Sequence, residues 1–194
     1  MLNKISCVLA SLMLAGAAHA TLIAEVAGNH DTIATAQGVN GSFSTDADAN
    51  IFNATTIPHV SIRGTGNGTW DMYRFSVGSG GSTATFDIDF GMPDLDSWLN
   101  LYAANGVLLA MQDDGGVTDP GSTHTWDSLL NYTFANAGDY VIAVGRFANA
   151  PLLNGQDYVL NISLANPGNN VPEPGLLGLL GIGALAAAMG RRRA

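Results

Sequence analysis

Apolar and polar residues alternate along much of the chain between residues 59 and 164, which is the pattern of β-strands. In residues 71–77 the side chains of Tyr73, Phe75 and Val77 fall on one face. Residues 84–90 repeat the pattern, with Thr and Asp placed between Ala, Phe, Ile and Phe. A period of two indicates strands with one face against a core. Turn clusters separate such runs, so the sequence predicts an all-β, antiparallel, jelly-roll-like β-sandwich of about 8–9 strands.

One connection in this pattern is clear. The dipeptide Asn-Gly at 105–106 lies between the apolar runs 98–103 and 107–111. Asn-Gly favours a tight primed turn, so the two runs predict a hairpin.

The N-terminal part of the sandwich region is less regular. Residues 25–37 predict one short helical turn with Asp31 as its N-cap. Residues 38–44 predict a strand, and residues 45–56 are polar and loop-like.

The N-terminus has the composition of a secretory signal peptide. Lys4 precedes an apolar stretch, and Ala18 and Ala20 form a small-x-small cleavage site. This pattern predicts a signal peptide over residues 1–20 and a mature chain that starts at Thr21.

The C-terminus carries a second apolar segment with different flanks. Val171, Pro172, Glu173 and Pro174 precede the uncharged run 175–190. Sixteen helical residues rise about 24 Å, a little short of the roughly 20 residues that a relaxed spanning helix prefers. A buried core helix or an unpacked tail is the alternative.

Three arginines favour the membrane interpretation of that run. Arg191, Arg192 and Arg193 follow it directly, and such a basic tail suits a cytoplasmic stop. The sequence therefore predicts a single transmembrane helix over 175–190 with a basic tail over 191–193.

Together, the Pro-Glu-Pro element, the weak transmembrane helix and the basic tail resemble the PEP-CTERM sorting signal of Gram-negative envelope proteins. The resemblance implies that residues 172–194 hold the protein in the inner membrane, facing the periplasm. It also implies that an exosortase, a membrane protease, cuts near Pro-Glu-Pro and delivers the product to the cell surface or extracellular matrix. The expected organisation is a sandwich domain at 21–165 and a linker at 166–171.

The domain between the two ends is strongly acidic. Of the 16 acidic residues only Glu173 lies outside it, whereas four of the seven basic residues do, which leaves 15 acids, three arginines and a net charge of −12. Such a surface repels phosphate backbones and excludes nucleic acid as a partner, whereas it attracts cations. The single cysteine lies in the signal peptide, so the mature domain has no disulfide.

Loop aspartates suggest a calcium site. Asp94, Asp96, Asp113 and Asp114 flank two adjacent predicted strands, so their loops are expected to converge at one end of the sandwich. Calcium takes six to eight oxygen ligands and tolerates irregular loops. The alternative is that these aspartates cap turns and solubilise loops.

Catalysis has little support in the sequence. The mature histidines are scattered, and there is no G-x-S-x-G elbow, phosphate-cradling loop or cysteine nucleophile. We therefore predict that the protein is not an enzyme. Trp98 and Trp126 neighbour the acidic loops and are candidates for stacking on a sugar, the alternative being two core aromatics.

Several motifs are similar to the bacterial pre-peptidase C-terminal domain. They are residues 29–37, 71–75, 96–102, 109–110, 113–114, 138–140 and 155–158. The resemblance implies a non-catalytic, jelly-roll-like β-sandwich related to collagen- and polysaccharide-associated modules. The segment 46–68 is longer than the resemblance leads one to expect.

The expected function is that of an exported, exosortase-processed envelope or matrix protein whose sandwich binds polysaccharide. Two alternatives remain open. One is a secreted carbohydrate-active hydrolase or accessory domain with an unrecognised carboxylate site, and the other is a purely structural surface protein.

Overall fold

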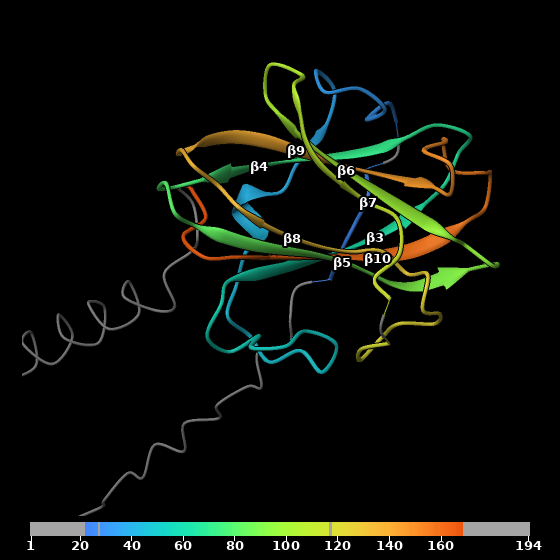
Figure 1. Cartoon of the computed structure of the whole chain (residues 1–194), viewed down its shortest axis with the longest axis horizontal. Coiled ribbons are helices and arrows are strands. Elements are labelled where there is room, and N and C mark those ends of the chain that lie inside the picture. Colours follow the sequence, from blue (N-terminus) through green and yellow to red (C-terminus); the bar gives the residue numbers. More distant parts are fainter. Residues whose placement is uncertain (1–21, 27, 117, 169–194) are drawn as a thin grey trace, which may run out of the picture.

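Two five-stranded sheets stack as two layers (Figure 1). The structure is a computed structural model, and it describes residues 22–26, 28–116 and 118–168. The first sheet contains, in spatial order, β1 (Leu22–Ala24), β3 (His59–Thr65), β10 (Asp157–Leu164), β5 (Thr83–Met92) and β8 (Leu129–Thr133). The second contains β2 (Gln37–Gly38), β4 (Asp71–Val77), β9 (Gly138–Arg146), β6 (Ser97–Ala103) and β7 (Leu108–Gln112).

The sheets are mixed at one edge each, which corrects the expectation of a wholly antiparallel sandwich. β1 pairs with β3 and β2 pairs with β4 in parallel, whereas the other named pairs are antiparallel. Parallel neighbours need long connections. Residues 25–58 provide one between β1 and β3, and the same segment supplies β2 to the opposite sheet.

The predicted strand at 38–44 is wrong beyond its first residue. β2 ends at Gly38 and a short 3-10 helix, η1 (Asn40–Ser42), follows it. The side chain of Asn40 explains why no ladder continues here. Its Nδ2 donates to Ser76 Oγ at 2.7 Å and its Oδ1 accepts from the Ser76 backbone N at 2.7 Å, so one side chain replaces the strand pairing.

The predicted helical turn at 25–37 is also absent from the described residues. A four-residue turn that does not continue into a helix is present instead, and the backbone N of Thr35 donates to Thr32 O at 3.1 Å to close it. The two threonine side chains bond one another at 2.7 Å. Threonine hydroxyls that bond locally in this way compete with helix formation.

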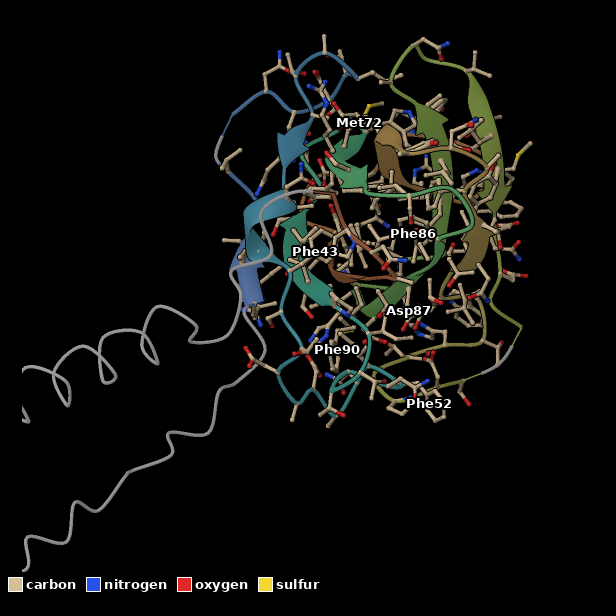
Figure 2. All side chains as sticks on the ribbon, turned by 90° about the vertical axis from the view of Figure 1, so that its left-hand side faces the viewer. Phe43, Phe52, Met72, Phe86, Asp87 and Phe90 are labelled. Atoms are coloured by element: carbon tan, nitrogen blue, oxygen red, sulfur yellow. The ribbon has the colours of Figure 1, made fainter. Side chains whose placement is uncertain are left out.

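The core lies between the sheets, as the alternation predicts. Tyr73, Phe75 and Val77 are buried, and so are Ala84, Phe86 and Ile88 on the facing strand. Figure 2 shows Phe43 and Phe86 between the two sheets. Phe90 departs from the pattern and is 46% exposed. Its φ of 54° coincides with a register shift in the pairing of β5 with β10, so a bulge turns the side chain outward.

The hairpin at the Asn-Gly dipeptide is confirmed, but its turn is not the primed type, because Gly106 has a positive φ and Asn105 does not. β6 pairs with β7 in antiparallel fashion, and Gly106 has a φ of +87°. Glycine adopts this left-handed conformation without steric cost. The backbone N of Val107 donates to Asn105 Oδ1 at 3.2 Å, which holds the turn.

Both predicted targeting segments lie outside the described residues. These are the signal peptide at 1–20 with Ala18 and Ala20, and the tail from Val171 through Arg193. Within the described ranges, no helix has the length and apolarity needed to cross a bilayer. Residues 166–168, expected in the linker, pair with the end of β4, where Val77 forms a bridge with Pro167.

Candidate metal centre and ligand pocket

Two loops meet at the rim of the sandwich where the sequence predicts a calcium site. Asp96 lies just before β6, and Asp113 and Asp114 follow β7. Each of the three offers a carboxylate oxygen, and these oxygens all lie within 4.8 Å of one another. Asp94 does not belong to this group; its side chain is exposed and its backbone has a φ of 42°. The structure therefore brings together three of the four predicted ligands.

A buried serine pair holds these loops together. Ser97 and Ser128 are both buried, and Ser128 N donates to Ser97 Oγ at 2.8 Å. Ser128 Oγ also donates to the carbonyls of Ser97, at 2.7 Å, and of Asp113. Because the start of β6 and the end of β7 share these bonds, their carboxylates are held close together.

The rim carboxylates lack partners for part of their hydrogen-bonding capacity. Asp96 Oδ1 and Asp113 Oδ1 are buried atoms without a hydrogen-bond partner among the described residues. Burial, followed by the charges of Asp113 and Asp114, raises the pKa of Asp96. Burial and Asp114 likewise raise the pKa of Asp113. The arrangement concentrates negative charge that a cation would neutralise.

The two tryptophans considered for sugar stacking differ in environment. Trp98 is half-buried, and its Nε1 donates to Asn100 Oδ1 at 3.1 Å. Trp126 is more exposed, and its ring stacks on that of His124 with centroids 4.4 Å apart and planes at 11°. Neither lines the pocket described next.

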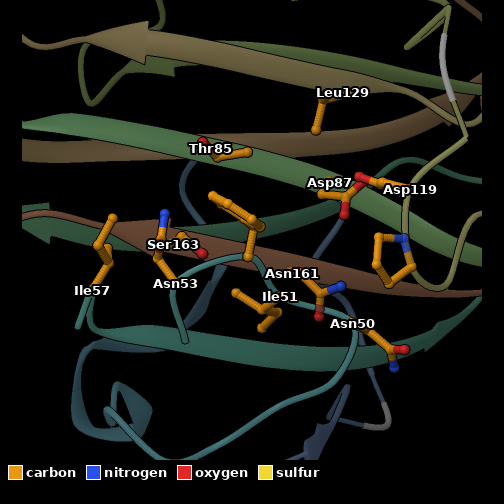
Figure 3. A pocket seen from close by; sticks show the side chains of 12 residues that line it. Asn50, Ile51, Asn53, Ile57, Thr85, Asp87, Asp119, Leu129, Asn161 and Ser163 are labelled. Atoms are coloured by element: carbon orange, nitrogen blue, oxygen red, sulfur yellow. The ribbon is translucent and has the colours of Figure 1, made fainter. Parts of the chain in front are cut away.

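A pocket of about 280 Å³ lies on the outer face of the first sheet, away from the core. The strand side chains in its lining are Thr85, Asp87, Leu129, Asn161 and Ser163, and the loop residues are Asn50, Ile51, Phe52, Asn53, Ile57, Asp119 and Pro120. Figure 3 shows Asn50, Ile51 and Asn161 along one side and Asp87 with Asp119 at one end.

The long segment between η1 and β3 forms one wall of this pocket. Ile51 and Ala54 are buried in it, so the loop packs against the sheet instead of extending into solvent. Phe52, in contrast, is 86% exposed at the pocket and lies at the outside of the molecule in Figure 2. Sequence reasoning missed this site, although an isolated aromatic in a polar insertion was a signal that could have found it.

A third polar cluster ties the N-terminal segment to β4. His30 Nε2 lies 3.4 Å from Glu25 Oε2 and 3.5 Å from Asp71 Oδ1, and the ligand atoms of the three residues lie within 4.8 Å of one another. Asp71 is fully buried, and burial raises its pKa to about 6 although a bond from Tyr158 opposes the shift. The nearby Glu25 charge acts in the same direction as burial.

Comparison with known proteins gives a clear result for the C-terminus. A family model described as the PEP-CTERM protein-sorting motif matches residues 170–193. No curated protein sequence matches the chain.

The sandwich is similar to several solved structures at low identity. They include the pre-peptidase C-terminal domain of a collagenase from Bacillus anthracis, with a TM-score of 0.36, 16% identity, and coverage of 55% of this chain and 89% of that one. Another is PliG from Aeromonas hydrophila, a periplasmic inhibitor of g-type lysozyme. It has a TM-score of 0.37 and 18% identity, and the match covers 59% of this chain and 93% of that one. The lipase BlEst2 from Bacillus licheniformis, in its propeptide form, has a TM-score of 0.39 and 13% identity. That match covers 63% of this chain and 25% of the lipase chain.

These three scores are too low to support any statement about activity or ligands. The match at the C-terminus is of a different kind, because it covers the Pro-Glu-Pro element, the apolar run and the arginines in one segment. Residues 170–193 are therefore a PEP-CTERM protein-sorting motif, which implies export, anchoring at the C-terminus and recognition by an exosortase-type protease at the membrane.

Proposed function

We propose that the protein is a component of the cell envelope or extracellular matrix whose sandwich domain is non-catalytic and binds polysaccharide. In this proposal the chain is first anchored in the inner membrane, facing the periplasm. Exosortase cleavage near Pro172, Glu173 and Pro174 then delivers the domain to the surface. The sorting motif at 170–193 supports the route.

The pocket on the outer face of the first sheet carries the proposal of polysaccharide binding. Its polar lining includes the amides of Asn50 and Asn53 and the hydroxyls of Thr85 and Ser163. Amide and hydroxyl groups both donate and accept hydrogen bonds, as sugar hydroxyls do. Phe52 adds an exposed apolar ring beside these groups, and such a ring can pack against a sugar face.

Calcium at the rim is a further part of this proposal. Asp96, Asp113 and Asp114 would each supply carboxylate oxygens, and Oδ1 of Asp96 and of Asp113 is buried without a partner among the described residues. Water would complete the six to eight ligands that calcium takes. The ion would fix the two loops at the edge of the domain.

A binding experiment with matched aromatic variants tests the proposal. Purified protein is sedimented with exopolysaccharide from a host that carries an exosortase, and Phe52→Ala is compared with Phe147→Ala. Phe147 is also exposed but lies outside the pocket. We expect Phe52→Ala to weaken binding about tenfold, the size of a lost stacking contact of roughly 1.4 kcal/mol, and Phe147→Ala to leave it unchanged. Binding by neither the wild type nor the variants would favour a purely structural protein.

The non-catalytic part of the proposal has its own test. Polysaccharide turnover is measured for the wild type and for Asp96→Asn and Asp114→Asn. We expect no turnover by any of them. Turnover by the wild type that either substitution abolishes would favour the hydrolase alternative, because two carboxylates are the usual machinery for glycoside hydrolysis.

A further inference from the structure

Three carboxylates converge on the outer face of β5, apart from the group at the rim. Asp87 and Asp89 are two positions apart on β5, so both point away from the core. Asp119 approaches from the loop between β7 and β8. Each of the three offers an oxygen, and these oxygens all lie within 4.8 Å of one another. Figure 3 shows the Asp87 and Asp119 carboxylates facing each other at the end of the pocket.

The loop that brings Asp119 packs tightly against β5. The backbone N of Phe90 donates to Gly121 O at 3.2 Å. Gly121 has a φ of +104°, and a Cβ at this position would overlap the Asp89 carboxylate. The backbone therefore closes over Asp89 on this side. The pocket lies beside the group, since Asp87 and Asp119 line it.

Asp89 is fully buried, and one of its oxygens has no partner among the described residues. Asn161 Nδ2 donates to Asp89 Oδ2 at 2.6 Å, and Ser61 Oγ donates to Asn161 Oδ1 at 2.7 Å. This chain of bonds orients the amide so that its nitrogen faces Asp89. Asp89 Oδ1 has no hydrogen-bond partner in the part of the chain that the structure describes, and the residue is 0% exposed. Buried polar atoms almost always have a partner, so this oxygen is free to accept a ligand.

Among the described residues, no basic side chain forms an ion pair with these three carboxylates. Within residues 22–26, 28–116 and 118–168, every ion pair involves a histidine, and none of them includes Asp87, Asp89 or Asp119. The charged groups that act on the cluster from neighbouring elements are further carboxylates, Asp127 and Asp48.

The protonation of the two strand aspartates agrees with this picture. Burial, followed by the charges of Asp89, Asp119 and Asp127, raises the pKa of Asp87 to about 8. Burial and the Asp119 charge raise the pKa of Asp89 to about 7, against the opposing effect of the Asn161 bond. Without a cation, these groups bind protons near neutral pH.

We propose that Asp87, Asp89 and Asp119 bind one calcium ion at the acidic end of the pocket. Calcium–oxygen bonds of about 2.3 to 2.6 Å place opposite ligands about 5 Å apart, so oxygens within 4.8 Å of one another fit a single ion. Oxygen-only donors favour calcium over zinc, which prefers histidine and cysteine. The pocket provides room for the water ligands that complete the shell.

This inference goes beyond the proposed function and does not depend on it. The ion would link β5 to the loop that carries Asp119, and so would fix one wall of the pocket. Calcium uptake is measured without polysaccharide, so failure of either proposal leaves the other intact.

Calorimetric titration of the purified full-length chain in mild detergent, stripped with chelator, tests the site. The Asp96→Asn/Asp113→Asn variant is used as background, so that the rim group does not contribute. In this background we expect one equivalent of calcium to bind and the Tm to rise with calcium. Adding Asp89→Asn or Asp119→Asn should abolish both effects, whereas Asp94→Asn, at an exposed position outside both groups, should leave them unchanged.

Stability in chelator separates a ligand from a structural aspartate. Above its pKa of about 7, Asp89 places a carboxylate without a cationic partner in the apo protein, so at pH 8 or higher Asp89→Asn should be at least as stable as its background in chelator. If Asp89→Asn instead lowers the Tm equally with and without calcium, and calcium uptake persists, the proposal is overturned. Absence of calcium uptake by the background variant overturns it as well. Should Asp89→Asn fail to fold, the half-buried Asp119→Asn decides by the same uptake measurement.

Discussion

The hydroxyl groups of Tyr73 and Tyr158 lie 2.7 Å apart and join the two sheets through the centre of the sandwich. Tyr73 is on β4 of the second sheet and Tyr158 is on β10 of the first. Tyr158 also bonds the buried carboxylate of Asp71, with its hydroxyl donating to Oδ2 at 2.8 Å. The core thus contains a hydrogen-bonded network of the Tyr73 hydroxyl, the Tyr158 hydroxyl and the Asp71 carboxylate, in which removing one group leaves another without its partner.

Removing the Tyr158 hydroxyl should cost more stability than removing that of Tyr73. Tyr158→Phe leaves both Asp71 Oδ2 and the Tyr73 hydroxyl without this partner, whereas Tyr73→Phe retains the bond to Asp71. An unsatisfied buried group costs about 1 to 3 kcal/mol. Urea unfolding should show the larger loss for Tyr158→Phe. Equal losses would mean that the bond to Asp71 contributes little.

Stability should fall with rising pH because of Asp71. Its pKa is about 6 in the folded protein against the ordinary 3.8. A raised folded-state pKa means that the folded state binds the proton more tightly, so its contribution is full below about pH 4 and is lost as pH rises through about 6. Asp71→Asn removes this contribution. We therefore expect the unfolding free energy of the wild type to fall relative to that of Asp71→Asn as the pH rises from 4 to 7. Both are measured by denaturant unfolding in chelator. A difference that is constant with pH would contradict the prediction.

Close packing of Tyr158 on Gly64 predicts a specific glycine requirement. The two residues face each other across β10 and β3, and a Cβ at Gly64 would overlap the Tyr158 ring. Overpacking of this kind costs about 1 to 3 kcal/mol. Gly64→Ala should therefore lower stability in denaturant unfolding. Gly38→Ala is the matched control, since Gly38 is also a strand glycine but no atom lies within 4 Å of its added Cβ.

The rim group predicts a calcium response of its own. A ligand that binds only the folded state stabilises it by about 2.7 kcal/mol at one hundred times its Kd. Asp113→Asn removes one proposed ligand, so calcium should raise the Tm of this variant less, relative to chelator, than it raises the Tm of the wild type. Asp94→Asn should behave as the wild type, as its side chain lies outside the group. An unchanged calcium response of Asp113→Asn would exclude this rim residue as a ligand.

Processing of the tail can be followed by mass. In a host with an exosortase, intact-mass measurement of the surface-released protein should show that Arg193 is missing. Substituting Pro172, Glu173 and Pro174 by alanine should leave the tail attached and the protein in the membrane fraction. Finding Arg193 on released wild-type protein would refute the cleavage.

Much of the fold follows from local patterns in the sequence. The inward placement of Tyr73, Phe75 and Val77 needs only the period of two, and the position of the β6–β7 hairpin follows from Asn-Gly between two apolar runs, although the turn type does not. The convergence of Asp96 with Asp113 could be predicted because adjacent strands of a hairpin bring their ends together. Asp94 lies outside that group, and its left-handed backbone and exposed side chain depend on the conformation of the turn.

The sequence by itself determined the sorting signal of this protein, because the motif is one contiguous segment and can be recognised without the fold. It also determined which face of each central strand meets the core. Only the tertiary structure decided that the opposite face of β5 is covered, so that Asp87 and Asp89 are buried where alternation places them toward solvent. The covering segments lie far from β5 in the chain, around Ile51 and Asp119. A periodicity of two reports the direction of a side chain, whereas its burial depends on which distant segment packs over it.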